Sequence, residues 1–303
     1  MFKITSYTPS SNISEGSHTL YVREKDALGN WSPVGSKEFT INITAPTGIG
    51  PKTTSNGVKP TFAWYSVSCA NAYNINIATD SNFTNVIDWP SIYSGSTQTY
   101  NLTWAMTHGT TYYWRIKSRN SSDIWGNSWS NTYSFRAEYT IGDTGPSGGI
   151  IFYDEQDSGC PDLSGDSRYI SAAPNSEEGC YDWGPTGTFI GGTASGVGTG
   201  YNNTAIIKNW LNSNGYLYCA AQDCWDCNYG GFSGWFLPSD DELYYMYSNL
   251  KLDGLGNFQN SFYWTSTEYD ANLAEMRHFN DPNHSPRTKT ADFYWRPARY
   301  IVD

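Results

Sequence analysis

The stretch that decides the fold of the second half of the chain reads Gly231-Phe-Ser-Gly-Trp235-Phe-Leu-Pro-Ser239-Asp-Asp-Glu242-Leu. Ser239 stands three residues before Glu242 and directly ahead of an apolar run, which is the spacing of a capping box. In this motif the serine hydroxyl and the glutamate carboxylate each accept a hydrogen bond from a backbone N–H that the helix leaves free. The stretch therefore predicts a helix that begins at Ser239.

Aromatic runs flank this predicted helix on both sides. Trp235-Phe-Leu precedes it, and Phe262-Tyr-Trp264 follows it. Runs of this kind are typical of β-strands, so we expect the helix and the strands to share one core. Trp235, Trp264 and Trp295 are expected to lie in that core.

Three motifs in this order resemble the C-type-lectin-fold domain of the bacterial DUF1566 (Lcl C-terminal) family. They are the Trp235–Leu243 stretch, Phe262-Tyr-Trp-Thr-Ser-Thr-Glu268 and Arg296-Pro-Ala-Arg299, and the resemblance extends back to Ile141–Tyr153. It covers about half of the chain. The resemblance implies an α+β C-type lectin fold with long loops, which are structured by core aromatics and often by disulfides.

Some members of this wider lectin-fold group are targets of diversity-generating retroelements, which randomise adenines in Asn-type codons near the C-terminus. Changing the first two bases of such a codon excludes Lys, Gln, Glu, Met and Trp. Residues 281–294 depart from the allowed set only at Lys289, and residues 270–278 depart only at Glu275 and Met276. The resemblance thus implies a variable binding surface over about residues 270–294.

The residues of this segment are a mixture of aromatic, Arg, His and small polar types, which adaptable binding surfaces use. The alternative is an ordinary polar hairpin with Phe279 in the core. Arg296 and Arg299, beyond the segment, are expected to brace the fold through hydrogen bonds. The candidate ligand-binding residues are Asp270, Asn272, Leu273, Arg277, His278, Asn280, Asp281, Asn283, His284, Ser285, Arg287, Thr288, Thr290, Asp292, Phe293 and Tyr294.

Length and composition indicate two or three β-rich domains. The chain has 303 residues, of which 17% are aromatic and 16% charged, with 29 glycines. Its fold class is predicted as mainly β Ig/Fn3-like sandwich modules at the N-terminus, followed by the α+β lectin-fold domain. The predicted domains are a partial Ig-like module (1–45), a fibronectin type III/Ig-like sandwich (46–137) and the lectin-fold domain (138–303).

An internal repeat leads to this division of the first half. Alternation around Leu20–Val22 and Phe39–Ile43 predicts half-buried strands with a Gly-Asn turn between them. The order Tyr-x-Arg-x-Lys, Gly-Asn, Trp-Ser and aromatic strand returns over 113–135. A β repeat of this length favours tandem sandwich modules. Residues 1–45 would be the final strands of a preceding module, so we expect the chain to be a fragment of a longer protein.

Further elements are predicted in the second half. Gly149–Tyr153 and Tyr169–Pro174 read as short strands. Residues 203–211 have apolar positions at helical spacing, with Asn203 or Thr204 as the cap and Gly215 as the stop.

The net charge of −11, without any Lys/Arg cluster, argues against nucleic acid and anionic membranes as partners. No apolar run approaches the roughly twenty residues that crossing a bilayer needs, so we expect no membrane insertion. A neutral or cationic partner fits the charge.

Six cysteines occur, and five of them crowd into the Gly- and Asp-rich second half. Such crowding favours disulfides in an oxidising compartment, and the odd number there leaves at least one thiol free. Alternatively, Cys219, Cys224 and Cys227 have a spacing that a zinc site uses, but a fourth ligand with supporting spacing is absent.

Calcium is the other cofactor that we weigh, although we expect none. An acidic run over 154–166 carries hard oxygen ligands in loop-like sequence, but its spacing is not that of an EF-hand, and a solvated acidic loop is the simpler interpretation. In calcium-dependent lectins a Glu-Pro-Asn or Gln-Pro-Asp loop holds the ion; here Asp281-Pro-Asn283 is the nearest match and reads more simply as a turn.

Nothing in the sequence favours catalysis. The lectin fold also serves formylglycine-generating oxidases, which use two reactive cysteines near the C-terminus, and no cysteine follows Cys227. His18, His108, His278 and His284 lie in no nucleophile or metal motif. We expect no enzymatic activity.

The sequence is therefore interpreted as a ligand-binding protein at an extracellular, cell or virion surface, with a protein or glycan on another cell or virion as its partner. The rival interpretations are an invariant structural or adhesive module of the cell envelope and, more weakly, a calcium-dependent lectin.

Overall fold

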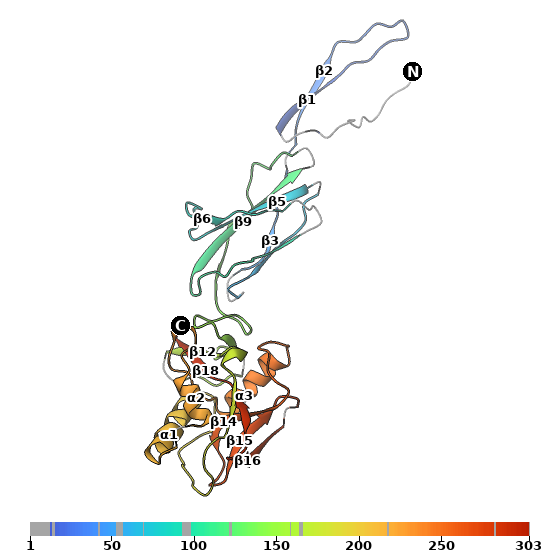
Figure 1. Cartoon of the computed structure of the whole chain (residues 1–303). Coiled ribbons are helices and arrows are strands. Elements are labelled where there is room, and N and C mark those ends of the chain that lie inside the picture. The colour runs from blue at the N-terminus through green and yellow to red at the C-terminus, as the bar shows by residue number, and fades with distance from the viewer. Residues whose placement is uncertain are drawn as a thin grey trace. The chain divides into compact units, whose positions relative to one another are not determined.

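The computed structural model describes residues 13, 16–41, 43–52, 57–68, 70–92, 98–120, 123–157, 159–163, 166–216, 218–281 and 283–302. The chain divides into two compact units, Met1–Glu138 and Tyr139–Asp303. This division lies one residue from the predicted start of the C-terminal domain. Strands predominate in both units, and the helices among the described residues all belong to the second unit (Figure 1).

The first two strands form an antiparallel hairpin, β1 (Gly16–Val22) with β2 (Gly35–Ile41). The alternation around Leu20–Val22 and Phe39–Ile43 predicted half-buried strands here. This is confirmed for Phe39 and Ile41 of β2, which are partly buried, and is wrong for Leu20 and Val22 of β1. Leu20 is 41% exposed and Val22 is 56% exposed. The physical reason is that a two-stranded ribbon buries little apolar area by itself.

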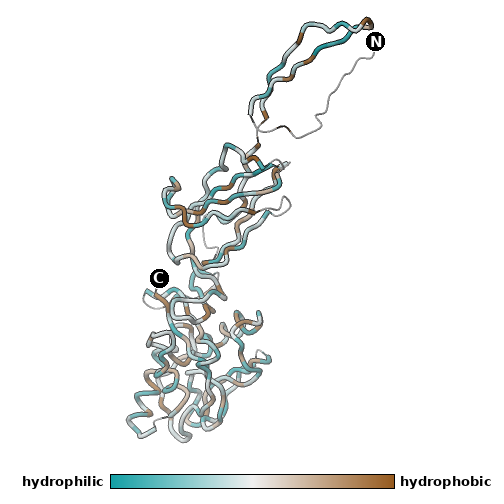
Figure 2. The backbone as a smooth tube through the Cα atoms, turned by 45° about the horizontal axis from the view of Figure 1, so that its top comes forward, coloured by the Kyte–Doolittle hydropathy of each residue, from teal (hydrophilic) through white to brown (hydrophobic). Residues whose placement is uncertain are grey.

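The rest of the first unit is a β-sandwich. One sheet has the order β3-β4-β8, and the other has the order β10-β9-β5-β6, with β7 also paired to β5. Buried side chains alternate with exposed or half-buried ones along β9. Hydrophilic and hydrophobic residues lie interspersed along the strands of this unit (Figure 2). The strands are β3 (Gly48–Gly50), β4 (Thr61–Trp64), β5 (Ala70–Ala78), β6 (Val86–Asp88), β7 (Ser91–Ile92), β8 (Thr99–Asn101), β9 (Thr111–Asn120) and β10 (Tyr133–Arg136).

Aromatic rings from both sheets meet in the sandwich core. Phe62 of β4 lies edge-on to Trp114 of β9, with ring centroids 5.3 Å apart, and both side chains are fully buried. Phe135 of β10 and Tyr73 of β5 belong to the same cluster. The predicted β-sandwich is confirmed by this two-layer arrangement.

Cations and aromatic rings alternate along one face of β9 in a ladder. The Arg115 guanidinium lies 3.9 Å from the ring centroid of Phe83 and 4.5 Å from that of Trp129. The Lys117 ammonium lies 4.7 Å from Trp129 and 5.4 Å from Trp125. Cations over aromatic faces are attracted by the ring quadrupole, so the ladder holds the 125–130 segment against the strand.

The second unit contains two sheets. A three-stranded antiparallel sheet has the order β11-β12-β18, and a five-stranded sheet has the order β13-β17-β14-β15-β16, in which β14 and β17 run parallel. The strands are β11 (Ile150–Asp154), β12 (Ser167–Ala172), β13 (Gly179–Tyr181), β14 (Phe262–Glu268), β15 (Leu273–His278), β16 (His284–Thr288), β17 (Phe293–Trp295) and β18 (Ala298–Val302).

Helices complete this unit. They are α1 (Gly200–Ser213), α2 (Ala220–Asp226) and α3 (Asp240–Met246), which continues as the π-helix η3 (Tyr247–Lys251); short 3₁₀ turns form η1 (Asn175–Glu177) and η2 (Tyr229–Gly231). None of the described helices is long and apolar enough to cross a membrane.

The capping box predicted at the start of α3 is confirmed. The Ser239 hydroxyl accepts a hydrogen bond from the Glu242 backbone N–H at 3.3 Å, and the Glu242 carboxylate accepts one from the Ser239 N–H at 2.7 Å. The same carboxylate also accepts hydrogen bonds from the Gly198 N–H and the Tyr300 hydroxyl. Glu242 is therefore buried with its hydrogen bonds made, as a buried carboxylate requires.

The predicted N-cap of α1, Asn203 or Thr204, is wrong by four or five residues. The helix begins at Gly200 with Thr199 as N-cap, and no side chain caps it. Asn203 and Thr204, the predicted caps, are buried and serve the packing instead: the Asn203 amide donates to the Ala194 carbonyl, and the Thr204 hydroxyl donates to Gly200.

The core predictions for the second unit hold. Trp235 and Trp264 are fully buried. Phe279, whose place in the core belonged to the alternative interpretation of an ordinary hairpin, is 1% exposed. Trp295 is half-buried and packs against the same cluster as Trp264. Arg296 is fully buried and donates to the Glu178 carboxylate and the Ala173 carbonyl, so it braces the fold as expected.

Candidate ligand-binding site

The predicted binding segment is centred on the antiparallel ribbon of β15 and β16 at the edge of the five-stranded sheet (Figure 1). The register pairs Arg277 with His284 and Glu275 with Pro286. Because side chains alternate along a strand, Glu275, Arg277 and His284 share one face, and Arg287 lies on the other. The expected single platform is therefore divided between two faces.

Half of the candidate residues are exposed. Seven others are partly buried, namely Asp270, Leu273, His278, Asp281, Ser285, Phe293 and Tyr294, and Arg277 is buried. The exposed residues are Asn272, Asn280, Asn283, His284, Arg287, Thr288, Thr290 and Asp292.

Arg277 was expected to be a contact residue, and its burial shows that expectation to be wrong. Its Nε donates to the Asp240 carbonyl at 2.8 Å, and its Nη2 donates to the Asp240 carboxylate at 2.6 Å. The guanidinium also stacks on Tyr244, 5.0 Å from the ring centroid. Arg277 therefore joins β15 to the first turn of α3.

Phe293 and Tyr294 of β17 are also less available than predicted. Phe293 packs on Trp264 with ring centroids 4.7 Å apart, and Tyr294 packs on Tyr263 at 5.7 Å. β17 lies between β13 and β14 inside the sheet, so its side chains contact rings of the neighbouring strands. Both residues support the framework with part of their surface.

The three residues that depart from the Asn-codon set are all held by the framework. Met276 is 2% exposed, and the Glu275 side chain is 14% exposed. Lys289 is fully buried, with its ammonium 2.5 Å from Glu268 and 2.9 Å from the Thr188 carbonyl. Lys289 thus fastens the end of β16 to β14.

Asp281 makes a turn between β15 and β16. Its carboxylate accepts a hydrogen bond from the Asn283 N–H at 3.0 Å and lies 3.2 Å from His278 Nδ1. The Asn283 N–H is the largest cause that holds the pKa of Asp281 below its ordinary value. The prediction of a turn at Asp281 is borne out, while Pro282 lies outside the described residues.

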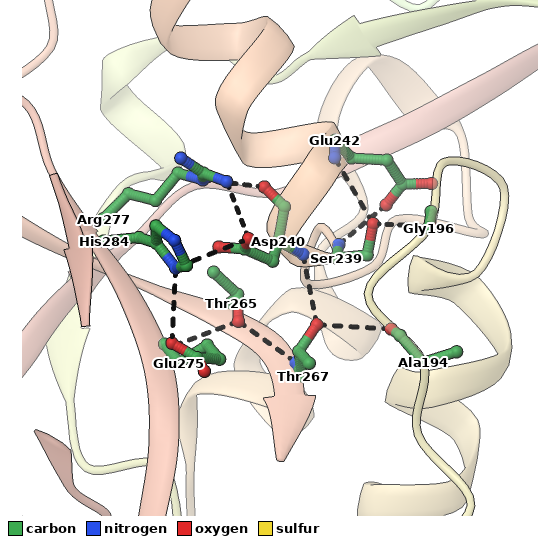
Figure 3. A network of polar contacts seen from close by, with 10 residues as sticks. All are labelled: Ala194, Gly196, Ser239, Asp240, Glu242, Thr265, Thr267, Glu275, Arg277 and His284. Atoms are coloured by element: carbon green, nitrogen blue, oxygen red, sulfur yellow. Dashed lines mark hydrogen bonds and ion pairs between the residues drawn. The ribbon is translucent and has the colours of Figure 1, made fainter. Parts of the chain in front are cut away.

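A polar network joins α3 to the face of the ribbon that carries His284 (Figure 3). His284 Nδ1 lies 3.9 Å from Asp240 Oδ2 and 3.7 Å from Glu275 Oε2. Burial, and then the charge of Asp240, raise the pKa of Glu275 and also that of Asp241. The sequence analysis did not include Asp240 or Glu275 among the candidate site residues. For Glu275 there was a signal, because this residue departs from the Asn-codon set.

Backbone contacts hold Asp240 in place within this network. The Asp240 N–H donates to the Thr267 hydroxyl at 3.1 Å, which donates in turn to the Ala194 carbonyl at 3.2 Å (Figure 3). Ser239 donates to the Gly196 carbonyl at 2.9 Å. The first turn of α3 is therefore fixed to both β14 and the 194–196 loop.

Some carboxylates of the acidic run at 154–166 make contacts that stabilise the fold. Asp154 is buried and forms a two-pronged ion pair with Arg168 at 2.9 and 3.0 Å. The Glu155 carboxylate accepts the Leu163 N–H at 2.9 Å. In the part of the chain that the structure describes, no group of three or more His, Cys, Asp or Glu side chains is arranged to hold a metal ion.

The expected disulfides are not formed among the five described cysteines, Cys160, Cys180, Cys219, Cys224 and Cys227. Cys219 caps α2, where its sulfur accepts the Gln222 N–H at 3.3 Å, and Cys224 is buried within the same helix. The helix thus sets the positions of both thiols, and burial raises the pKa of the Cys219 thiol to about 11. Cys69 lies outside the described residues.

Comparison with known proteins leaves the family open. No family model matches the chain, and no curated protein matches it. Solved structures with partial similarity include an Fn3-like protein from Clostridium thermocellum, at 22% identity over 32% of this chain and 98% of that one, with a TM-score of 0.25. The CbhA fibronectin(III)-like modules of the same organism match at 9% identity over 31% of this chain and 98% of that chain, with a TM-score of 0.23. The chicken CNTN1 FN1-FN3 domains match at 16% identity over 44% of this chain and 46% of that chain, with a TM-score of 0.27.

Proposed function

We propose that the chain is a surface-displayed ligand-binding protein. Its second unit is a C-type-lectin-fold domain of the DUF1566 kind, and the 270–294 segment is its diversified binding site. Fibronectin type III/Ig-like modules precede this domain as spacers. The partner is a protein or glycan on another cell or a virion, bound without catalysis, at an extracellular, cell or virion surface.

One observation carries the proposal. The residues that the Asn-codon mechanism cannot produce, Glu275, Met276 and Lys289, are all held by the framework, together with some that it can produce, such as Arg277 and Phe279. The eight exposed candidates are all of types that the mechanism does produce. This division is what a variable surface on a constant scaffold requires, because variation at buried positions would destabilise the fold.

The topology of each unit supports the assigned folds. In the second unit β18 pairs with β12, so the last strand closes the sheet that contains the first strand, β11. Three α-helices and a second sheet lie between them in sequence. In the first unit, sheets of order β3-β4-β8 and β10-β9-β5-β6 form the kind of sandwich that Ig and fibronectin type III domains share.

The burial pattern narrows the proposed contact surface to the exposed candidates. The scaffold is held by Arg277, Phe293 and Tyr294. The exposed residues His284 and Thr288, and the exposed residues Asn280 and Asn283 of the turn between β15 and β16, can be substituted without loss of these contacts. The net charge of −11 favours a neutral or cationic partner over nucleic acid.

A test combines four exposed substitutions, Asn283→Ala, His284→Ala, Arg287→Ala and Thr288→Ala, in one chain. We expect its melting temperature to stay within about 4 °C of the wild type, because exposed substitutions change stability little. The control Met276→Ala removes buried side-chain volume and should cost about 2–5 kcal/mol. A loss of cooperative unfolding in the fourfold variant would contradict the proposal.

A display library at the same four positions tests binding directly. Selected against an immobilised basic protein, it should yield binders that keep the parental melting temperature. A library of equal size on exposed sandwich positions, such as Thr61 and Asn101, serves as the control. If both libraries yield binders equally often, the 270–294 segment has no special role.

The second candidate function is an invariant structural or adhesive module. It is favoured by the burial of Arg277 and the partial burial of Phe293 and Tyr294. Sequencing the DNA beside the gene separates the two functions. A reverse transcriptase gene and an imperfect copy of the 3′ coding end, differing only at adenines, would support diversification, and their absence would support the invariant module.

A further inference from the structure

The β1–β2 hairpin and the segment after β9 share one turn geometry. An antiparallel bridge joins Lys25 to Trp31 after β1, and another joins Arg119 to Trp125 after β9. The bridged cation lies over the tryptophan ring in both places, 5.3 Å from the centroid in the hairpin and 5.4 Å from it after β9. Residues of the hairpin therefore correspond to residues 94 positions later in the chain, Lys25 to Arg119 and Trp31 to Trp125.

The hydrogen bonds of the two turns match under the same shift. The Asp26 N–H donates to the Asn30 carbonyl at 2.9 Å, and the Asn120 N–H donates to the Ile124 carbonyl at 3.0 Å. The side-chain oxygens of Asp26 and Asn120 each also accept the N–H four residues later, at 2.9 and 3.1 Å. The turn is therefore one structure that occurs twice, and β1 is the counterpart of β9.

The second strand of the hairpin is the counterpart of β10. Phe39 of β2 lies opposite His18, with ring centroids 5.7 Å apart. Phe135 of β10 lies opposite Tyr112, which is the counterpart of His18, with ring centroids 6.0 Å apart. The hairpin thus repeats β9 and β10, the last two strands of the sandwich, in the same register.

The apolar face of the hairpin is exposed, although its counterpart in the sandwich is core. Leu20 and Val22 are 41% and 56% exposed, whereas their counterparts Trp114 and Ile116 are fully buried. In the sandwich, Phe62 of β4 packs on Trp114, with ring centroids 5.3 Å apart, and β5 pairs with the edge of β9. Among the residues that the structure describes, β1 pairs only with β2. In this part of the chain the hairpin thus presents both an apolar face and an open strand edge.

We propose that the β1–β2 hairpin is an acceptor for the strands that complete a second β-sandwich. One entering strand pairs antiparallel with the open edge of β1, as β5 pairs with β9. Another packs across Leu20 and Val22, as β4 packs across the core face of β9. The partner is a partial module of the same sandwich kind, which carries counterparts of β4 and β5. The hairpin is therefore a docking surface for a neighbouring module, and this role is independent of the proposed binding site at residues 270–294.

The pairing of β5 with β9 specifies the side chains of the entering strand. Two isoleucines of β5, Ile77 and Ile75, lie opposite the counterparts of Leu20 and Val22. The polar Asn76 stands between them. We therefore expect apolar residues opposite Leu20 and Val22 and a polar residue between them. Leu20 is smaller than the tryptophan that is its counterpart, so the strand across the face needs a larger side chain to reach native packing density.

A second copy of the hairpin fits this surface less well. Two β1 edges can pair with each other, but the sheet that results keeps its apolar face exposed, because no second layer lies across Leu20 and Val22. A sandwich buries that face between two layers and pairs the strand edge at the same time. The counterpart of the hairpin in the first unit has this two-layer form.

The experiment extends the full chain at its N-terminus with a Gly/Ser linker and a copy of residues 60–78 that carries Cys69→Ser. This copy contains β4 and β5, and the tether raises its effective concentration at the hairpin. Hydrogen exchange followed by mass spectrometry should show the β1 amides exchanging about tenfold more slowly than in the unextended chain, because paired amides exchange only through opening. A copy of the same composition in scrambled order is the control. Equal exchange rates with both copies would overturn the proposal.

Substitutions on opposite faces of β1 test the geometry in the extended chain. Val22→Asp places a charge in the docked face and should remove the protection, whereas Tyr21→Asp on the other face, at a side chain that is 69% exposed, should keep it. Leu20→Trp restores the bulk of its counterpart and should increase the protection, even if the unmodified hairpin docks weakly. Equal effects of the two Asp substitutions, or no protection with Leu20→Trp, would overturn the proposal. A concentration-dependent dimer of the unextended chain with slowed β1 exchange would also overturn it, because the edge would then belong to a second copy.

Discussion

Two arginines of the candidate segment, Arg277 and Arg287, differ in burial although both were predicted as contact residues from the sequence. Arg277 and Arg287 lie on neighbouring strands, yet Arg277 is 8% exposed and bound to Asp240, while Arg287 is exposed and donates to the carbonyl of Pro286. Removing one partner of a buried ion pair leaves the other charge without compensation, whereas an exposed charge is screened by water.

The first prediction compares these two positions. We expect Arg277→Met to lower the free energy of unfolding by about 3–5 kcal/mol, because Asp240 would remain buried without its cation. Arg287→Met should change it by less than about 0.5 kcal/mol. Urea denaturation followed by tryptophan fluorescence measures both. Similar losses for both variants would contradict the assignment of Arg277 to the framework.

The second prediction concerns the carboxyl group of Glu275, whose pKa is raised by burial and by Asp240. An acid whose pKa rises on folding stabilises the fold while it is protonated, and that contribution is lost as the pH rises through the folded-state pKa. We expect Glu275→Gln and wild type to unfold at equal urea concentrations near about pH 4, where the carboxyl is protonated. At pH 7 the variant should be the more stable of the two. A variant that is less stable at pH 7 would show that the ionised carboxylate is well paired.

At the scale of elements, local signals were readable from the sequence and distant pairings were not. The capping box lies within four residues, so Ser239 and Glu242 predicted the start of α3 correctly. The start of α1 was missed because Thr199 makes no side-chain cap bond.

The burial of Arg277 could not be predicted from the sequence either. It depends on Asp240, thirty-seven residues earlier in the chain, and on the packing of α3 against β15. The resemblance drew attention to the 270–294 segment, whose role in binding stays a prediction, and only the register of β15 and β16 divides its residues between two faces.

The third prediction tests the cation–aromatic ladder on β9. Lys117→Met keeps the aliphatic stem over Trp125 and Trp129 but removes the charge. We expect a loss of about 1 kcal/mol, since two partly exposed rings each lose one of their cations, while Arg115 stays over Trp129 and Arg119 over Trp125. Lys37→Met on β2, an exposed position, is the matched control and should be neutral. Thermal unfolding of both variants gives the comparison. If Lys117→Met is as stable as the wild type, the aliphatic stem alone holds the 125–130 segment against β9.

At the scale of the whole molecule, each unit has its own core. The sandwich cluster contains residues of the first unit, and the clusters around Phe236, Trp264 and Tyr169 contain residues of the second. A unit with its own core can fold alone.

The fourth prediction follows from this independence. A chain of residues 139–303 should unfold cooperatively, and its melting temperature should lie within about 3 °C of the corresponding transition in the full chain. Differential scanning calorimetry measures both. Broad, non-cooperative unfolding of the shorter chain would show that its core depends on the first unit.

The pairing of β18 with β12 has a consequence for synthesis on the ribosome. Ser171 and Arg299, which lie opposite each other in these strands, are 128 residues apart in the chain. At roughly 5–20 residues per second, translation leaves β12 without this neighbour for several seconds or more. A nascent chain therefore presents an open strand edge during that interval, and a premature stop codon just before Ala298 would make that edge permanent.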